Sequence, residues 1–92
     1  MNIEFDPAKR AATLEARGLD MGRAGEVFEG PSLTITDDRQ DYGEQRNITV
    51  GILDERMVVL VWTPRSRARR IISLRKANER EQQSYGDRLG LG

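Results

Sequence analysis

Residues 46–62, RNITVGILDERMVVLVW, hold two predicted strands joined by a tight turn, and this stretch decides the fold. Residues 46–53 alternate with the period of a strand, which places on one face Arg46, Ile48, Val50 and Ile52. The turn at 54–56 leads into residues 57–62, which are apolar without alternation. A strand that is apolar on both faces is typical of a sheet centre covered on both sides. We therefore expect a hairpin in the middle of a small sheet.

The residues before this hairpin predict a short strand, two helices and a further strand. Ile3 and Phe5 alternate with polar neighbours, and Asp6-Pro7 is a helix N-cap followed by proline at the first helical position. The first helix should cover residues 7–17, because Gly18 is suited to the position after its end. A second short helix follows to Gly30-Pro31, then a strand at 32–36 and an acidic loop at 37–44.

The residues after the hairpin predict a turn at 63–66, a last strand at 69–75 and a final helix at 79–88. The strand period places on one face Arg69, Ile71, Ser73 and Arg75, and on the other Arg70, Ile72 and Leu74. Asn78 and Glu81 have the spacing of a capping box, and Tyr85 is the expected anchor of the final helix. The whole pattern predicts one α+β domain over residues 1–92, with an antiparallel sheet of about four strands.

The composition excludes several kinds of chemistry. The 92 residues include no cysteine and no histidine, which removes the common zinc ligands, Ser-His and Cys-His nucleophiles and the commonest general base. We therefore expect no metal and no cofactor. Residues 57–62 form the longest apolar run and are too few to span a bilayer, so the sequence reads as a cytoplasmic protein without membrane contact.

The charge is distributed asymmetrically although its sum is zero. Residues 1–55 hold 6 basic and 12 acidic side chains, whereas residues 56–92 hold 9 basic and 3 acidic ones. Thirteen of the basic residues are arginine, whose planar guanidinium suits phosphate and carboxylate, although an arginine-rich codon usage explains the bias equally well. Residues 65–76 alone hold six basic residues. This segment predicts either a phosphate-binding face or an edge strand protected by charge.

Three further residues are candidates for chemistry. Lys9 lies in the first turn of a helix, where the macrodipole disfavours a cation; with Thr13 and Arg17 it forms either part of an anion-binding surface or an ordinary exposed stripe. Glu44 and Arg46 lie at the start of a strand. They are either an acid/base and a phosphate clamp, respectively, or an ordinary ion pair on the surface. Trp62 ends a buried strand and is expected in the core rather than as a base-stacking platform.

The order of several short motifs resembles the BrnT family, the toxin half of the BrnT/BrnA toxin-antitoxin systems. The features that carry the resemblance are Phe5-Asp6-Pro7-x-Lys9, Gly18, Ala24-x-x-Val27-Phe28, Pro31, Glu44-x-Arg46-x-Ile48-x-x-Gly51, Val58 to Val61, Thr63-x-Arg65, and Arg70-Ile71-Ile72-Ser73-x-Arg75-Lys76-Ala77-x-x-x-Glu81-x-x-x-Tyr85. The resemblance implies a RelE-like fold, with a small antiparallel sheet and helices on one side, and cleavage of RNA. It also implies a BrnA-type antitoxin, bound in a 2:2 heterotetramer and contacting operator DNA through its own domain.

Our leading hypothesis is a metal-independent endoribonuclease in which the 2′-OH of the RNA attacks the adjacent phosphate. The candidate phosphate clamp consists of Arg46, Arg65 and Arg75, and the candidate proton acceptor is Lys9 or Glu44. The expected RNA-binding residues are Arg70, Lys76 and Arg17, and the residues expected to be dispensable are Arg67 and Arg69.

The alternative is a non-catalytic interaction module or co-repressor subunit that binds nucleic acid or a protein through the arginine-rich face. Growth arrest on expression and a metal-free RNA digest discriminate the two. An enzyme for small molecules has little support, because the sequence has no glycine-rich phosphate loop and no metal cluster.

Overall fold

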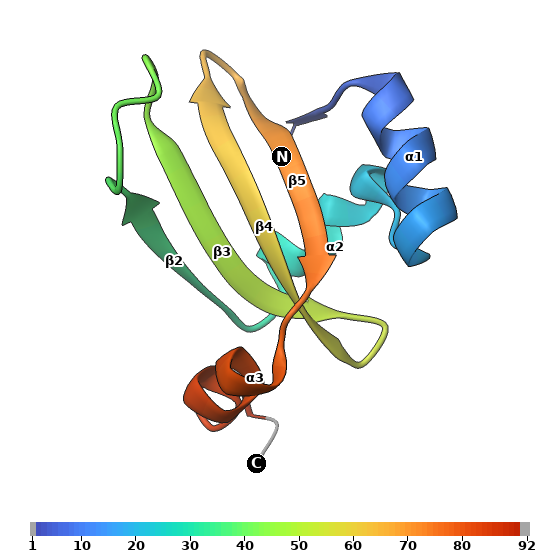
Figure 1. Ribbon diagram of the computed structural model, residues 1–92, viewed down its shortest axis with the longest axis vertical. Helices are drawn as coiled ribbons and strands as arrows, with labels where there is room; N and C mark the ends of the chain where they lie inside the picture. Colours follow the sequence, from blue (N-terminus) through green and yellow to red (C-terminus); the bar gives the residue numbers. More distant parts are fainter. Residues whose placement is uncertain (1, 91–92) are drawn as a thin grey trace.

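The predicted hairpin is formed by β3 (Arg46–Leu53) and β4 (Arg56–Arg65) in the computed structural model, which describes residues 2–90 (Figure 1). Its two-residue turn places Asp54 and Glu55 at positive φ, which matches the twist of a tight hairpin. The other elements, in chain order, are β1 (Ile3–Glu4), α1 (Pro7–Arg17), the 3-10 helix η1 (Met21–Arg23), α2 (Ala24–Glu29), β2 (Ser32–Asp37), β5 (Ala68–Lys76) and α3 (Glu79–Tyr85).

The sheet has five strands in the order β1-β5-β4-β3-β2. Neighbouring strands are antiparallel except β1, which pairs in parallel with β5 through Ile3 opposite Arg69. The α+β class is confirmed, and the count of about four strands rises to five because the short N-terminal strand joins the sheet.

The N-terminal helices form where their caps predict them. The Asp6 carboxylate accepts a hydrogen bond from the Ala8 N–H at 2.8 Å, Pro7 opens α1, and Gly18 closes it at φ 68°. Asp20 caps the next turn through the Gly22 N–H at 2.8 Å, so the second predicted helix consists of η1 and α2.

The two faces of the sheet carry separate cores, and β4 contributes to both as predicted. Val58, Leu60 and Trp62 face η1 and α2, and the Trp62 indole N–H donates to the Thr49 hydroxyl at 2.8 Å. Val59 faces α3, where Tyr85 packs as the expected anchor. The expectation of helices on one side is therefore wrong, because α3 lies on the face opposite to α1 and α2.

The helix α3 is shorter than predicted. Its capping box is present, with mutual hydrogen bonds between Asn78 and Glu81, but the helix ends at Tyr85 rather than at residue 88. Gly86 follows at once, and glycine is a poor helix former. The chain then turns, and the buried Leu89 packs under α3 together with Tyr85.

A β-bulge in β5 overturns the predicted assignment of its faces. Val61 pairs with Ser73 but Trp62 pairs with Ile71, so Ile72 has no partner on β4 and the alternation shifts by one residue. Ile71 is consequently buried beside Leu74, which the unbroken period had placed on the opposite face. The same shift separates Arg69 from Arg75 and places Arg75 on the face of Arg70.

The predicted turn at residues 63–66 is also shorter, because β4 continues to Arg65. The pairing between β3 and β4 begins at Asn47 opposite Trp62, so Pro64 lies beyond the last pair on that side. There its missing N–H breaks no ladder hydrogen bond.

Candidate functional site

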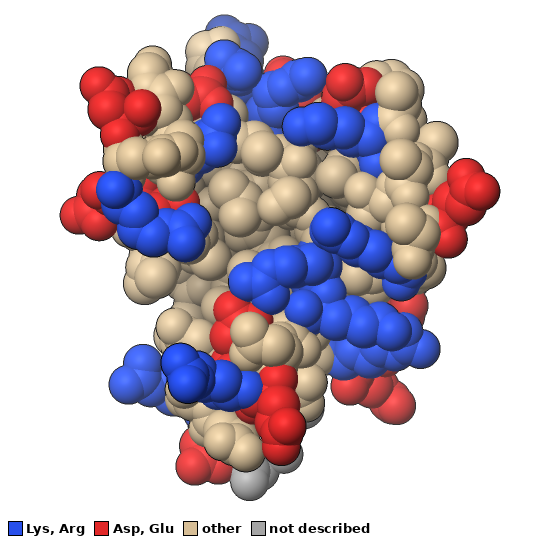
Figure 2. Space-filling model, viewed as in Figure 1, with Lys and Arg blue, Asp and Glu red and all other residues tan. Residues whose placement is uncertain are grey.

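The upper part of the α3-side sheet face has no helix over it, and we name it the open face. It is defined by residues of three strands, namely Arg46, Ile48, Val61, Thr63, Arg65, Arg70, Ser73 and Arg75. Figure 2 views this face and shows a pale, uncharged centre surrounded by basic side chains. Of the predicted site residues, the four arginines of this set are thus brought to one surface by β3, β4 and β5.

Glu44 lies between two of these arginines. Its carboxylate oxygens are 3.8 Å from Nε of Arg46 and 3.7 Å from a terminal nitrogen of Arg65. The three residues meet because β3 begins where its antiparallel neighbour β4 ends. At these distances the ion pairs contain no short hydrogen bond, so the guanidinium donors remain able to bind another oxyanion.

Arg46 is held by an aromatic ring. Its guanidinium carbon lies 4.1 Å from the centroid of the Tyr42 ring, and its buried Nε has no hydrogen-bond partner among the described residues. The Tyr42 hydroxyl donates to Asp37 at 3.0 Å. Asp37 also accepts two hydrogen bonds from the Arg39 side chain at 2.8 and 2.9 Å, which hold the pKa of this buried carboxyl well below its usual range.

Sequence reasoning missed Tyr42 and Asp37 as supports of the site. The available signal was one aromatic residue in an acidic loop, four positions before a candidate arginine. Such a ring can position a guanidinium through a cation–π contact.

Arg75 forms a bidentate ion pair on the open face. Its two terminal nitrogens donate to the two carboxylate oxygens of Glu81 at 2.8 and 2.9 Å. These bonds raise the pKa of Arg75 and lower the pKa of Glu81. Arg70 is paired more loosely, with Glu4 at 3.8 Å.

The other predicted residues lie away from Glu44. Arg17 donates to the Leu74 carbonyl at 2.8 Å and so fastens α1 to β5. The side chain of Lys9, on the first turn of α1, forms no hydrogen bond or ion pair within residues 2–90, and α1 lies on the other side of the sheet from the open face.

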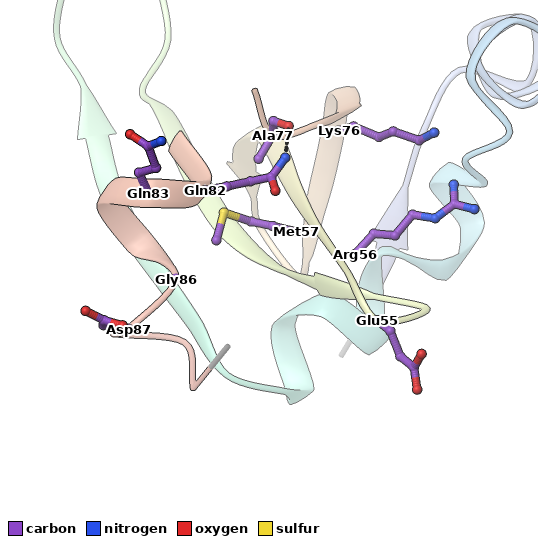
Figure 3. Close-up of a pocket in the computed structure, with 9 residues that line it drawn as sticks. All are labelled: Glu55, Arg56, Met57, Lys76, Ala77, Gln82, Gln83, Gly86 and Asp87. Carbon is purple, nitrogen blue, oxygen red and sulfur yellow. Dashed lines mark hydrogen bonds between the residues drawn. The ribbon is translucent and has the colours of Figure 1, made fainter. Parts of the chain in front are cut away.

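Lys76 lines a cavity of about 560 Å³ between α3 and the ends of β4 and β5 (Figure 3). Its other lining residues are Glu55, Arg56, Met57, Ala77, Gln82, Gln83, Gly86 and Asp87. Lys76 therefore faces a mixed-charge pocket at the start of β4, the end of that strand opposite to Arg65.

Arg69 lies on the helix-covered side of the sheet. Its guanidinium is 4.3 Å from the Phe28 ring centroid and 4.8 Å from that of Trp62, so it packs on the core. Its replacement should therefore affect folding, whatever its effect on function. Trp62 itself is buried, which confirms its predicted place in the core.

Residues 2–90 contain no cluster of three side chains that could hold a metal ion. None of their helices has the length and apolar character needed to cross a membrane.

The open face gathers arginines from three strands, two of them beside the Glu44 carboxylate, and such donors suit an oxyanion such as a phosphodiester. The family model described as the ribonuclease toxin BrnT of type II toxin-antitoxin systems matches residues 5–81. The chain therefore belongs to this family, and its sheet is consistent with a RelE-like toxin. Membership implies an RNA substrate and a cognate antitoxin. No curated protein matches the chain.

Proposed function

We propose that the open face binds RNA and cleaves it without a metal ion, with Glu44 as the proton acceptor. The observation that carries this proposal is the position of the Glu44 carboxylate between Arg46 and Arg65 on an uncovered surface. Lys9, the other candidate, lies on α1 and has no contact with this group. A base must reach the proton that it removes, so geometry favours Glu44.

In the proposed reaction the 2′-OH transfers its proton to Glu44 while its oxygen forms a bond to the adjacent phosphorus. The bond from phosphorus to the 5′ oxygen breaks, and that oxygen takes a proton from water. The hydroxide left from that water takes the proton from Glu44, which restores the water molecule and the carboxylate. The products are a 2′,3′-cyclic phosphate and a 5′-OH. Arg46 and Arg65 stabilise the negative charge that develops on the phosphorane, because their donors lie beside the Glu44 carboxylate that takes the proton.

Arg70 and Arg75 lie further along β5 and bind neighbouring phosphates in this scheme. Arg75 must exchange the Glu81 carboxylate for an RNA phosphate, which offers the same arrangement of acceptor oxygens. Lys76 and Arg17 lie outside the open face, Lys76 at the pocket and Arg17 on α1, and they remain predicted contacts for RNA that continues past the end of β5. Each phosphate contact adds affinity that salt weakens.

The test is a digest of labelled RNA in EDTA with matched variants. Glu44→Gln and Arg65→Ala should each lower the cleavage rate by about 100-fold, since positioned bases and oxyanion donors contribute about that much. Arg67→Ala is the control, because Arg67 lies in the adjacent turn and forms no ion pair within residues 2–90. It should change the rate by less than about threefold. A folded Glu44→Gln variant with the parental rate would rule out the base.

We also propose that the cognate antitoxin is of the BrnA type, that the two proteins form a 2:2 complex in the cytoplasm, and that operator DNA is bound through the antitoxin. The support is family membership and the acidic first half of the chain. Native mass spectrometry of the co-expressed pair should give the mass of two copies of each. A 1:1 mass at micromolar concentration would contradict the stoichiometry.

A further inference from the structure

The outer edge of β2 is an unpaired strand edge. Among residues 2–90, β2 pairs only with β3 and ends the strand order, and Figure 1 shows no labelled element beyond it. Its residues Ser32–Thr36 include no charge and no proline, and Ile35 is 55% exposed. Edge strands are normally protected by charge, proline, a bulge or a covering segment, because their free N–H and C=O groups pair readily with another strand.

The opposite edge of the sheet is protected by such devices. There β1 has only two residues, includes the charged Glu4, and precedes α1, whose Arg17 reaches the backbone of β5. β5 is thus covered by β1 at Arg69 and Arg70 and by Arg17 at Leu74, whereas the whole length of β2 is available for pairing.

We propose that an extended, basic segment of the antitoxin pairs with β2 as a sixth strand. Strand addition satisfies the free backbone groups and buries Ile35 against an apolar side chain. The charges beside β2 favour a basic segment. The exposed carboxylate of Glu29 lies before the start of β2, and those of Asp38 and Asp41 lie after its end. Lysine or arginine at both ends of the incoming strand would complement them.

A second copy of this chain fits the same edge poorly. Antiparallel pairing of two β2 strands brings Glu29 of each copy toward the acidic loop of the other. Like charges brought together at an interface oppose its formation. The position of the added strand has a further consequence. The loop that carries Glu44 begins where β2 ends, so an antitoxin segment that continues past Asp37 reaches the open face.

The experiment measures binding of the full-length cognate antitoxin, produced from the same operon, to purified toxin variants. Ile35→Lys adds the charge that protects natural edges and should weaken binding at least about tenfold. Leu14→Lys is the matched control, since Leu14 is similarly exposed, at 48%, on α1 at the other side of the sheet. It should change the affinity less than about twofold. Thr36→Lys, at an exposed position of the same strand, should repeat the effect of Ile35→Lys.

Hydrogen exchange supplies an independent measure on the parent complex. The amides of β2 should exchange at least about tenfold more slowly in the complex than in the free toxin. Unchanged exchange, or parental affinity of both edge variants, would overturn the proposal. A free toxin dimer that Ile35→Lys dissociates would assign the edge to self-association instead and would also overturn it.

This inference rests on the antitoxin proposed above, and the two can fail separately. If the parent toxin does not bind the antitoxin, the partner assignment fails and the strand proposal with it. If the parent binds and the edge variants bind equally well, only the strand proposal fails. Thermal unfolding of each variant confirms that the comparison is made between folded proteins.

Discussion

The pair between Arg75 and Glu81 allows a quantitative test of how α3 is held on the sheet. In Glu81→Gln the amide oxygen can still accept from the Asn78 N–H, but the charge that binds Arg75 is lost. The pair is bidentate and the Glu81 side chain is 23% exposed, so its contribution should lie near the upper end for surface pairs, about 1 kcal/mol. For a domain of this size that corresponds to a fall in Tm of about 4–8 °C.

The control is Glu79→Gln. Glu79 lies in the same first turn of α3 and forms no ion pair among the described residues, so it loses only its interaction with the helix dipole, about 0.3–1 kcal/mol. Urea unfolding of the parent, the two variants, Arg75→Met and the double variant Arg75→Met/Glu81→Gln gives a coupling energy for the pair. That coupling should be about 0.5–1 kcal/mol.

The pH dependence has a definite sign. The folded-state pKa of Glu81 is lowered by the Arg75 hydrogen bond, so its stabilisation is complete above the unfolded-state value of about 4.3 and is lost as the pH falls through the folded-state value. The difference in stability between parent and Glu81→Gln should therefore be constant at neutral pH and narrow below about pH 4. A zero coupling energy, or a difference that grows in acid, would refute the reasoning.

Two further predictions concern the sheet and its packing against α2. Gly51→Ala should lower the free energy of unfolding, measured in urea, by about 1–3 kcal/mol, because its Cβ would lie 2.5 Å from a methyl carbon of Val27. Gly25→Ala should raise it by about 0.5–1 kcal/mol, because the nearest atom to its Cβ is 4.0 Å away and alanine is the better helix former. Equal effects of the two would contradict the packing. Thr49→Val removes the hydroxyl that accepts from the Trp62 indole N–H and is also bonded to the Thr34 hydroxyl, and it should cost about 1–3 kcal/mol. Parental stability would show that these two bonds are dispensable.

The bounds of several elements could be predicted because local chemistry determines them. Asp6, Pro7 and Gly18 define α1 by capping, and the alternation of residues 46–53 defines β3. The β-bulge at Ile72 could not be predicted, because neither Ile72 nor its neighbours are glycine and the extra residue exists only relative to the partner strand. The face of the sheet on which α3 packs could not be predicted either, because it depends on the path of the chain after β5.

The candidate site was predictable in part. Arg46 and Glu44 are close in sequence. Residue type and the family resemblance indicate Arg65 as a third member, and the sheet brings the three residues together. The support of Arg46 by Tyr42 was not predictable, because it depends on the path of an irregular loop. The roles of these residues in RNA cleavage remain predictions for the digest described above.

The register of β5 also sets a length scale for the substrate. Arg70 pairs with Thr63, and Arg75 pairs with Val59, so the two arginines are separated by four steps of β4, about 13 Å. Their side chains lean apart, one toward Glu4 on β1 and the other toward Glu81 on α3. One phosphate cannot bridge that span, so a dinucleotide should engage only part of the surface, and cleavage should become more efficient as the RNA is lengthened to cover both.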